Sequence, residues 1–252
     1  MNYTIHKKGK YSYIQEGKGP VLLLLHGLFG STGNFTALID DFKSDYTVIT
    51  PILPIFELPP KKLSVHSLTA HIEGFILENK LKKVHVVGNS LGGHLGLLLT
   101  LSQPNLVKTL TLTGSSGLFE NALGDGFPRR QNYEFVREVC ARTFHDPKVA
   151  TKELVDEVYE TVNTPRKGLN IIIAAKSAMR TNLEHELHKI MVPTLLIWGR
   201  EDQITPLFVG EDFKEKISGS ELHILDNCGH APMMEKPKYF NELLAIFLKK
   251  NP

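Results

Sequence analysis

The chain has 252 residues, of which 42% are hydrophobic and 22% are charged, and its formal net charge at pH 7 is +2. These values are typical of a globular protein with one sizeable core, and the nearly balanced charge argues against nucleic acid as a main partner. The N-terminus lacks the apolar core of a signal peptide, no run reaches transmembrane length, and Cys140 and Cys228 are too few for a disulfide framework. We therefore expect a cytoplasmic protein with no membrane partner, and the sequence leaves its oligomeric state open.

The first third of the chain alternates between strand and helix patterns. Residues 3–16 alternate loosely around a lysine-rich turn, which predicts a β-hairpin. Residues 21–25 form a continuous apolar run, typical of a strand that is buried on both faces. Apolar spacing then predicts a helix over 35–42, a strand over 46–53 and a helix over 65–80.

The same rhythm continues as far as Gly114. Residues 83–89 predict a strand, a helix follows and ends near Gln103, and residues 107–113 predict another strand. This alternation predicts an α/β fold built on a doubly wound, mostly parallel sheet with helices on both faces.

After Gly114 the strand pattern stops for about 75 residues. Helical segments are predicted instead, near 130–144, 150–163 and 168–188. We interpret residues 115–190 as a helical lid, or cap, inserted into a single α/β core formed by residues 1–114 and 191–252. In the second part of that core we expect a strand over 194–198, a helix over 206–217, a strand over 221–225 and a final helix through Phe240.

A serine lies at the point where the strand over 83–89 meets the following helix. The segment 86–93 reads VVGNSLGG, with Gly88 and Gly92 two residues on either side of Ser90. A side chain at either glycine would collide with a neighbouring strand or with the start of the helix, and Gly93 lets the helix approach the sheet. This G-x-S-x-G pattern predicts a nucleophile elbow, with Ser90 in a strained turn at the helix N-terminus.

A serine hydroxyl needs a base that takes its proton and an acid that orients the base. His230 follows the last predicted strand and Asp202 follows the strand over 194–198, so both lie at the edge where open α/β sheets place their sites. Glu201 and Asp226 are rival acids. We prefer Asp202, because it occupies a strand end of its own and because the order Ser, Asp, His fits an elbow of this kind.

The oxyanion donors are expected to be two backbone amides. Leu91 follows the nucleophile, and Leu28 follows the His26-Gly27 pair at the end of the strand over 21–25. Phe29 comes next in the chain, and we expect it to line the substrate pocket.

Together these residues resemble the α/β-hydrolase fold family along essentially the whole chain. Four segments carry the resemblance: 26–30 (HGLFG), 88–93 (GNSLGG), 199–202 (GRED) and 229–230 (GH). The resemblance implies a triad of Ser90, Asp202 and His230, with Leu28 and Leu91 as the oxyanion hole. The second and third segments look like the branch that contains the meta-cleavage-product C–C hydrolases, whereas the first looks more like small bacterial esterases.

The chain departs from the C–C hydrolase pattern in several places. Ala231 stands where those enzymes have a tryptophan after the catalytic histidine, and Arg166 and Arg180 match their lid arginine by region only, with surface positions expected for both. An apolar, proline-rich stretch over 51–60 replaces the family's acidic, glycine-rich loop. This stretch either forms a rim of the pocket or packs on the body of the protein.

Other sites do not fit the sequence. Gly27, Gly30 and Gly33 have the wrong spacing for dinucleotide binding, and the segment 185–188 (HELH) is not a metal-binding H-E-x-x-H motif. The sequence therefore predicts a serine hydrolase that needs no cofactor or metal and acts on a small, largely apolar carbonyl substrate, a carboxylic ester. The alternatives are a C–C bond hydrolase of the meta-cleavage-product type, and a triad-bearing ligand receptor or signalling protein with little turnover.

Overall fold

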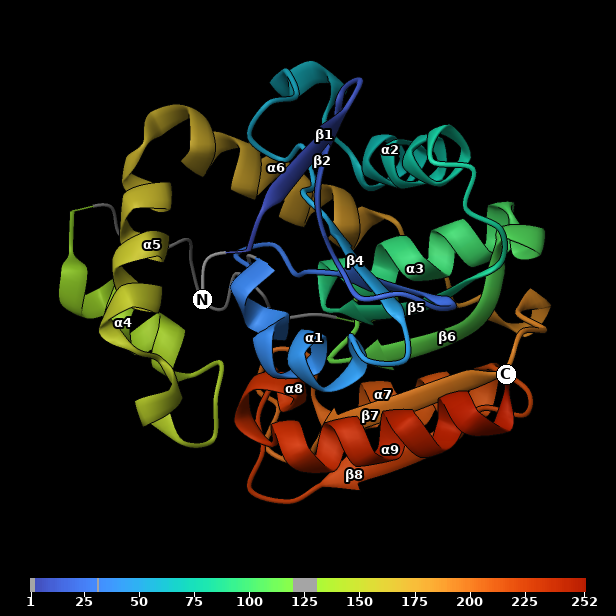
Figure 1. Ribbon diagram of the computed structural model, residues 1–252. Coiled ribbons are helices and arrows are strands. Elements are labelled where there is room, and N and C mark those ends of the chain that lie inside the picture. The colour runs from blue at the N-terminus through green and yellow to red at the C-terminus, as the bar shows by residue number, and fades with distance from the viewer. Residues whose placement is uncertain (1–2, 31, 120–130) are drawn as a thin grey trace.

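A computed structural model describes residues 3–30, 32–119 and 131–252 of the protein, so part of the predicted insertion, residues 120–130, lies outside the described residues. The described residues form one eight-stranded sheet in the order β1-β2-β4-β3-β5-β6-β7-β8 (Figure 1). Its strands are β1 (Ile5–Lys8), β2 (Tyr11–Glu16), β3 (Val21–Leu25), β4 (Thr47–Pro51), β5 (Val84–Asn89), β6 (Val107–Thr113), β7 (Thr194–Gly199) and β8 (Glu221–Leu225).

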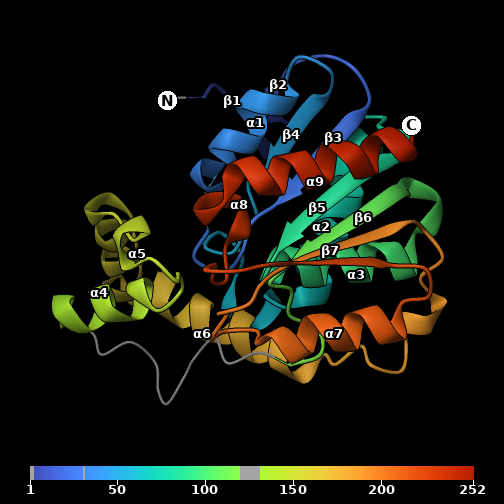
Figure 2. The same cartoon turned by 90° about the horizontal axis from the view of Figure 1, so that it is seen from below.

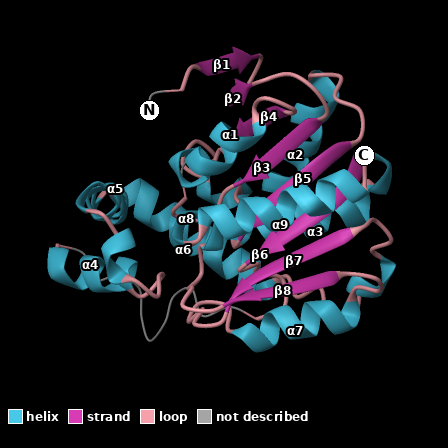
Figure 3. Cartoon of the chain, turned by 60° about the horizontal axis from the view of Figure 1, so that its bottom comes forward, coloured by secondary structure: helices cyan, strands magenta, loops and turns pink. Residues whose placement is uncertain are grey.

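The strand directions confirm the doubly wound, mostly parallel sheet. β1 and β2 form the predicted hairpin, β2 pairs antiparallel with β4, and the pairs from β4 through β8 are parallel. Figure 3 shows the parallel strands with their carboxyl ends at a common edge of the sheet.

Helices cover both faces of the sheet. The α-helices are α1 (Thr36–Phe42), α2 (Val65–Glu78), α3 (Leu91–Ser102), α4 (Tyr133–Ala141), α5 (Lys152–Asn163), α6 (Pro165–Arg180), α7 (Leu207–Lys216), α8 (Pro232–Glu235) and α9 (Pro237–Lys250). Short 3-10 helices lie at Thr32–Phe35, Pro60–Lys62, Pro104–Leu106, Pro147–Val149 and Leu187–Lys189.

The apolar run of β3 is divided between these two helical layers. Leu23 and Leu25 pack in the core with α2, α3, α6 and α7, whereas Leu22 and Leu24 pack in the core with α1, α8 and α9. Successive strand residues point to opposite faces, which explains why a strand covered on both faces has no polar alternation.

Between β6 and β7 the described chain contains three α-helices, which differ in where they pack. α4 and α5 share a small apolar cluster of their own, which includes Val136, Val155 and Val162, and in Figure 2 they project from the body. In contrast, α6 contributes Ile171 and Ala174 to the main core. The helix predicted over 168–188 was wrong at both ends, because Pro165 begins α6 and the helix ends at Arg180.

The proline-rich stretch over 51–60 packs on the body of the protein. Leu53 and Ile55 are buried in the main core. Asn170 of α6 donates hydrogen bonds to the carbonyl oxygens of Ile55 and Leu58 at 2.7 and 3.1 Å. Of the two alternatives left open by the sequence, the structure therefore supports the packed loop.

Candidate active site

Ser90 connects β5 to α3 in a strained conformation. Its φ of 55° and ψ of −120° are rare for a residue with a side chain. Several bonds hold it there: its amide donates to the Thr113 carbonyl at 3.1 Å, and its carbonyl accepts from the amides of His94 and Ser116 at 3.2 and 3.3 Å. This backbone geometry is that of the predicted elbow.

The flanking glycines allow the close approach that the sequence predicted. A Cβ atom at Gly88 would lie 2.5 Å from the carbonyl oxygen of Gly92, at the start of α3. A Cβ atom at Gly92 would overlap the carbonyl oxygen of Leu25, at the end of β3. Only glycine fits at either position without moving a strand or the helix.

His230 and Asp202 form a buried pair beside the elbow. His230 Nδ1 lies 2.9 Å from Asp202 Oδ2 and 3.1 Å from Oδ1, and the two side chains are 8% and 0% exposed. Asp202 also accepts from the amides of Ile204 and Thr205 and from the Thr205 hydroxyl, at 2.8 to 2.9 Å. These bonds fix the carboxylate, which in turn fixes the imidazole ring.

The rival acids point elsewhere. Glu201 Oε2 accepts a hydrogen bond from the amide of Cys228 at 2.9 Å. Asp226 is exposed and pairs with Arg200. Only Asp202 of these three contacts the His230 ring in the described residues.

One asparagine ties the serine and histidine loops together. Asn89 precedes Ser90, and its Nδ2 donates to the carbonyl oxygens of Thr113 and His230, both at 3.0 Å. The side chain therefore joins the ends of β5 and β6 to the loop after β8. The sequence analysis did not identify Asn89, because its partners lie 24 and 141 residues away in the chain.

The predicted oxyanion donors are the backbone amides of Leu91 and Leu28. Leu91 is the first residue of α3, where an amide has no partner within its own helix. Leu28 lies inside a turn closed by a bond from the Gly30 amide to the Gly27 carbonyl, so the turn does not use the Leu28 amide for closure. Burial lowers the pKa of His26, and its Nδ1–H donates to the Gly27 carbonyl at 2.8 Å.

Ser90 and His230 line one cavity of about 130 Å³. Phe29, the predicted pocket residue, also lines it, as does Leu28, whereas Arg166 and Arg180 are exposed residues of α6 outside its lining. Six further apolar lining residues come from the segment that carries α4 and α5: Val136, Val139, Cys140, Phe144, Leu154 and Val158. The sequence analysis did not name these residues, although their helical spacing marks one apolar face.

Cys140 behaves as an apolar part of this lining. Burial raises the pKa of its thiol to about 11, so the thiol is neutral at pH 7. None of the described residues that line the cavity is an arginine or lysine.

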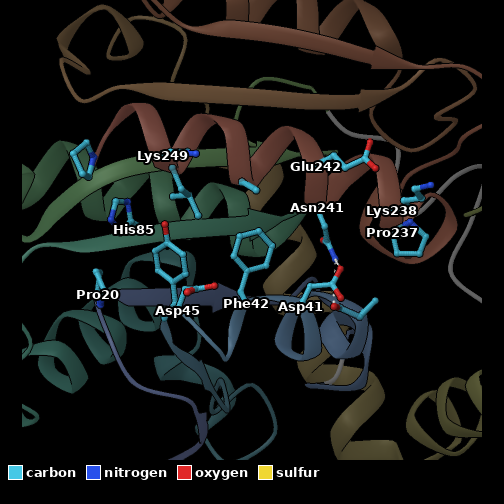
Figure 4. Close-up of a pocket in the computed structure, with 15 residues that line it drawn as sticks. Pro20, Asp41, Phe42, Asp45, His85, Pro237, Lys238, Asn241, Glu242 and Lys249 are labelled. Carbon is cyan, nitrogen blue, oxygen red and sulfur yellow. Dashed lines mark hydrogen bonds between the residues drawn. The ribbon is translucent and has the colours of Figure 1, made fainter.

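A second cavity, of about 980 Å³, lies between α1 and α9 (Figure 4). Pro20, Tyr46 and His85 place it at the amino ends of β3, β4 and β5. Figure 4 shows Asn241 of α9 pointing toward Asp41 of α1, to which its Nδ2 donates at 2.7 Å.

Within residues 3–30, 32–119 and 131–252, no helix combines the length and the apolar character needed to cross a membrane. The same residues contain no group of three or more His, Cys, Asp or Glu side chains that could hold a metal ion.

Residues 20–237 match the family model described as alpha/beta hydrolase fold. Among solved structures, the chain is 37% identical to MGS-MChE2, an alpha/beta hydrolase enzyme from the metagenome of lagoon sediments at Mar Chica, Morocco, with 98% of each chain covered and a TM-score of 0.81. It is 28% identical to 2-hydroxy-6-oxononadienedioate/2-hydroxy-6-oxononatrienedioate hydrolase 1 of Pseudomonas putida, covering 98% of this chain and 93% of the relative.

The chain is also 26% identical to monoacylglycerol lipase ABHD6 of Bos taurus, covering 98% of this chain and 82% of the lipase. The first two curated relatives, dioate hydrolases of Pseudomonas sp. and Cupriavidus pinatubonensis, are matched over only 64% and 66% of their own length. The relatives thus include hydrolases named for quite different substrates.

Proposed function

This chain belongs to the α/β-hydrolase fold family, and on that premise we propose that it is a serine hydrolase that cleaves a small, largely apolar carboxylic ester. The observation that carries the proposal is the buried Asp202–His230 pair, whose histidine lines the same cavity as the strained Ser90. A nucleophile, a base and an acid that orients the base are the parts that acyl transfer by serine requires.

In the proposed reaction Ser90 Oγ attacks the ester carbonyl carbon while His230 takes the hydroxyl proton. Asp202 holds the imidazole so that Nδ1 keeps its proton and Nε2 acts as the base. The amides of Leu28 and Leu91 bind the oxyanion of the tetrahedral intermediate. His230 then protonates the departing alcohol, and water, activated by the same histidine, releases the acid from Ser90.

The cavity lining favours a neutral ester over the substrate of the dioate hydrolases. A dioate carries two carboxylates, and the described lining supplies no arginine or lysine that could pair with them. A monoacylglycerol is an uncharged ester, which fits an apolar lining. In this proposal α4 and α5 act as the lid, and Phe29, which packs against their apolar cluster, lines the pocket beside them.

The test is a panel of p-nitrophenyl esters from acetyl to decanoyl, run beside a C–C hydrolase substrate and a fluorophosphonate label. We expect turnover of the shorter esters and labelling of Ser90. In Ser90→Ala both should be lost, with kcat lower by about 10⁴ or more. Turnover of the C–C substrate alone would support the second candidate function, and neither turnover nor labelling would support a ligand receptor instead.

A further inference from the structure

The loop that carries His230, residues 227–231, is held by three successive backbone amides. Each amide donates to a different part of the molecule: the loop before Asp202, the helix α8, and the segment that follows α4. The three bonds run from Cys228 N to Glu201 Oε2 at 2.9 Å, from Gly229 N to Glu235 Oε2 at 2.6 Å, and from His230 N to the Thr143 carbonyl at 2.8 Å.

Glu235 makes a second bond that reaches across to the cap. Its other oxygen, Oε1, accepts from the amide of Asp146 at 2.6 Å. One carboxylate thus bridges the His230 loop and the segment over 143–146, through two bonds of the charge-assisted kind that are stronger than bonds between neutral groups.

The bridged segments are in close backbone contact. A Cβ atom at Gly229 would lie 2.6 Å from the Thr143 carbonyl oxygen and 2.9 Å from Phe144 Cα, so only glycine allows this approach. Thr143 and Phe144 also line the cavity that contains Ser90. The same short segment therefore shapes the pocket and supports the histidine backbone.

The carboxylate of Glu235 lies close to the thiol of Cys228, and the thiol stays protonated. Burial, and after it the charge of Glu235, raises the pKa of Cys228. A hydrogen bond between the neutral thiol and Glu235 contributes to the same shift, so the Glu235 carboxylate contacts the thiol as well as the two amides.

We propose that Glu235 is a positioning residue, whose carboxylate couples the cap segment over 143–146 to the His230 loop and so fixes the base relative to the pocket. The proposal rests on the function proposed above. Displacing a catalytic group by about 1 Å can cost about a hundredfold in rate, so a loosened loop should reduce kcat and not only stability.

The test compares Glu235→Ala and Glu235→Gln with Glu242→Gln, a matched control on the exposed face of α9. Hydrogen exchange at residues 143–146 and 227–230 reports the bridge directly, without any need for turnover. Steady-state kinetics on an ester that the wild type hydrolyses, measured well below the unfolding temperature, separates kcat from KM.

We expect Glu235→Ala to expose both segments to exchange together, to lower kcat by about tenfold or more and to raise KM. Glu235→Gln keeps one acceptor oxygen and should give a smaller loss of about threefold. Glu242→Gln should stay within about twofold of the wild type.

Two results would overturn the proposal: unchanged exchange in both segments, or a lower unfolding temperature with unchanged kcat and KM. A wild type without turnover or Ser90 labelling would instead refute the proposed function. In that case the exchange experiment alone still decides whether Glu235 joins the two segments.

Discussion

The two cavities lie at opposite edges of one sheet and differ in what the fold brings to them. The smaller, of about 130 Å³, contains Ser90 and His230. The larger, of about 980 Å³, is lined in the described residues by aromatic, charged and apolar side chains and by Asn241, with no serine, threonine or cysteine. Reactive side chains gather where parallel strands end, because each strand delivers its loop to that edge. Position in the topology therefore identifies the candidate site better than cavity size does.

After the loss of the nucleophile itself, the largest expected effect is at the acid. Asp202→Asn should lower kcat on esters by about 10³ or more, because the amide no longer selects the imidazole tautomer that can act as a base. Asp226→Asn, the matched control on an exposed rival, should stay within about twofold. An equal loss of kcat in the two variants would show that Asp202 is not the acid that orients His230.

The buried His94 near Ser90 should lower the free energy of unfolding at acid pH. His94 lies one turn after Ser90 in α3 and is fully buried, and burial, followed by the charge of His66, lowers its pKa to about 4. The unfolded chain binds this proton near pH 6.5, so His94 favours unfolding as pH falls from about 6.5 toward 4.

For His94 we expect a loss of about 2 kcal/mol in the free energy of unfolding between pH 7 and pH 5. His94→Gln should show a flatter pH dependence in denaturant titrations at the two pH values. If the free energy of unfolding depends equally on pH in wild type and variant, His94 is not a buried histidine that stays neutral in the folded state.

A smaller effect is expected from the pocket lining. Phe29→Ala removes apolar contact with the substrate, and we expect kcat/KM for the preferred ester to fall about tenfold. The labelling rate of Ser90 by a small fluorophosphonate should change less, because that probe does not fill the pocket. A larger loss in labelling than in ester turnover would place Phe29 in the chemistry instead of in binding.

The larger cavity should give no effect on turnover. The double variant Lys238→Ala, Lys249→Ala changes two lysines that line it, and we expect kcat/KM within about twofold of the wild type. A loss of tenfold or more in kcat/KM, with the unfolding temperature unchanged, would show that the larger cavity also contributes to turnover.

Local sequence patterns predicted the parts of the fold that depend on local chemistry. The strands over 21–25, 107–113 and 221–225 have the predicted bounds, because each is an apolar or β-branched run with clear stops. The end of α6 was missed, because the helical pattern continues past Arg180 while the chain turns.

The site shows the same division. Ser90, Asp202 and His230 could be selected because each follows a strand, and a parallel sheet gathers such positions. Asn89 and Glu235 could not, because their bonds go to backbone groups 141 and 89 residues away, and no local pattern encodes such a partner. The packing of the loop over 51–60 could not be predicted either, because the loop is bonded to Asn170, more than 100 residues later in the chain.

The joint between the cap and the His230 loop has a consequence for divergence within the family. On the cap side it uses the carbonyl oxygen of Thr143 and the amide of Asp146, groups that every residue except proline can supply. The side chains there can change without loss of these bonds, and α4 and α5 already have an apolar cluster of their own. The side chains of α4 and α5 can therefore vary while the backbone bonds that join this segment to the His230 loop are kept.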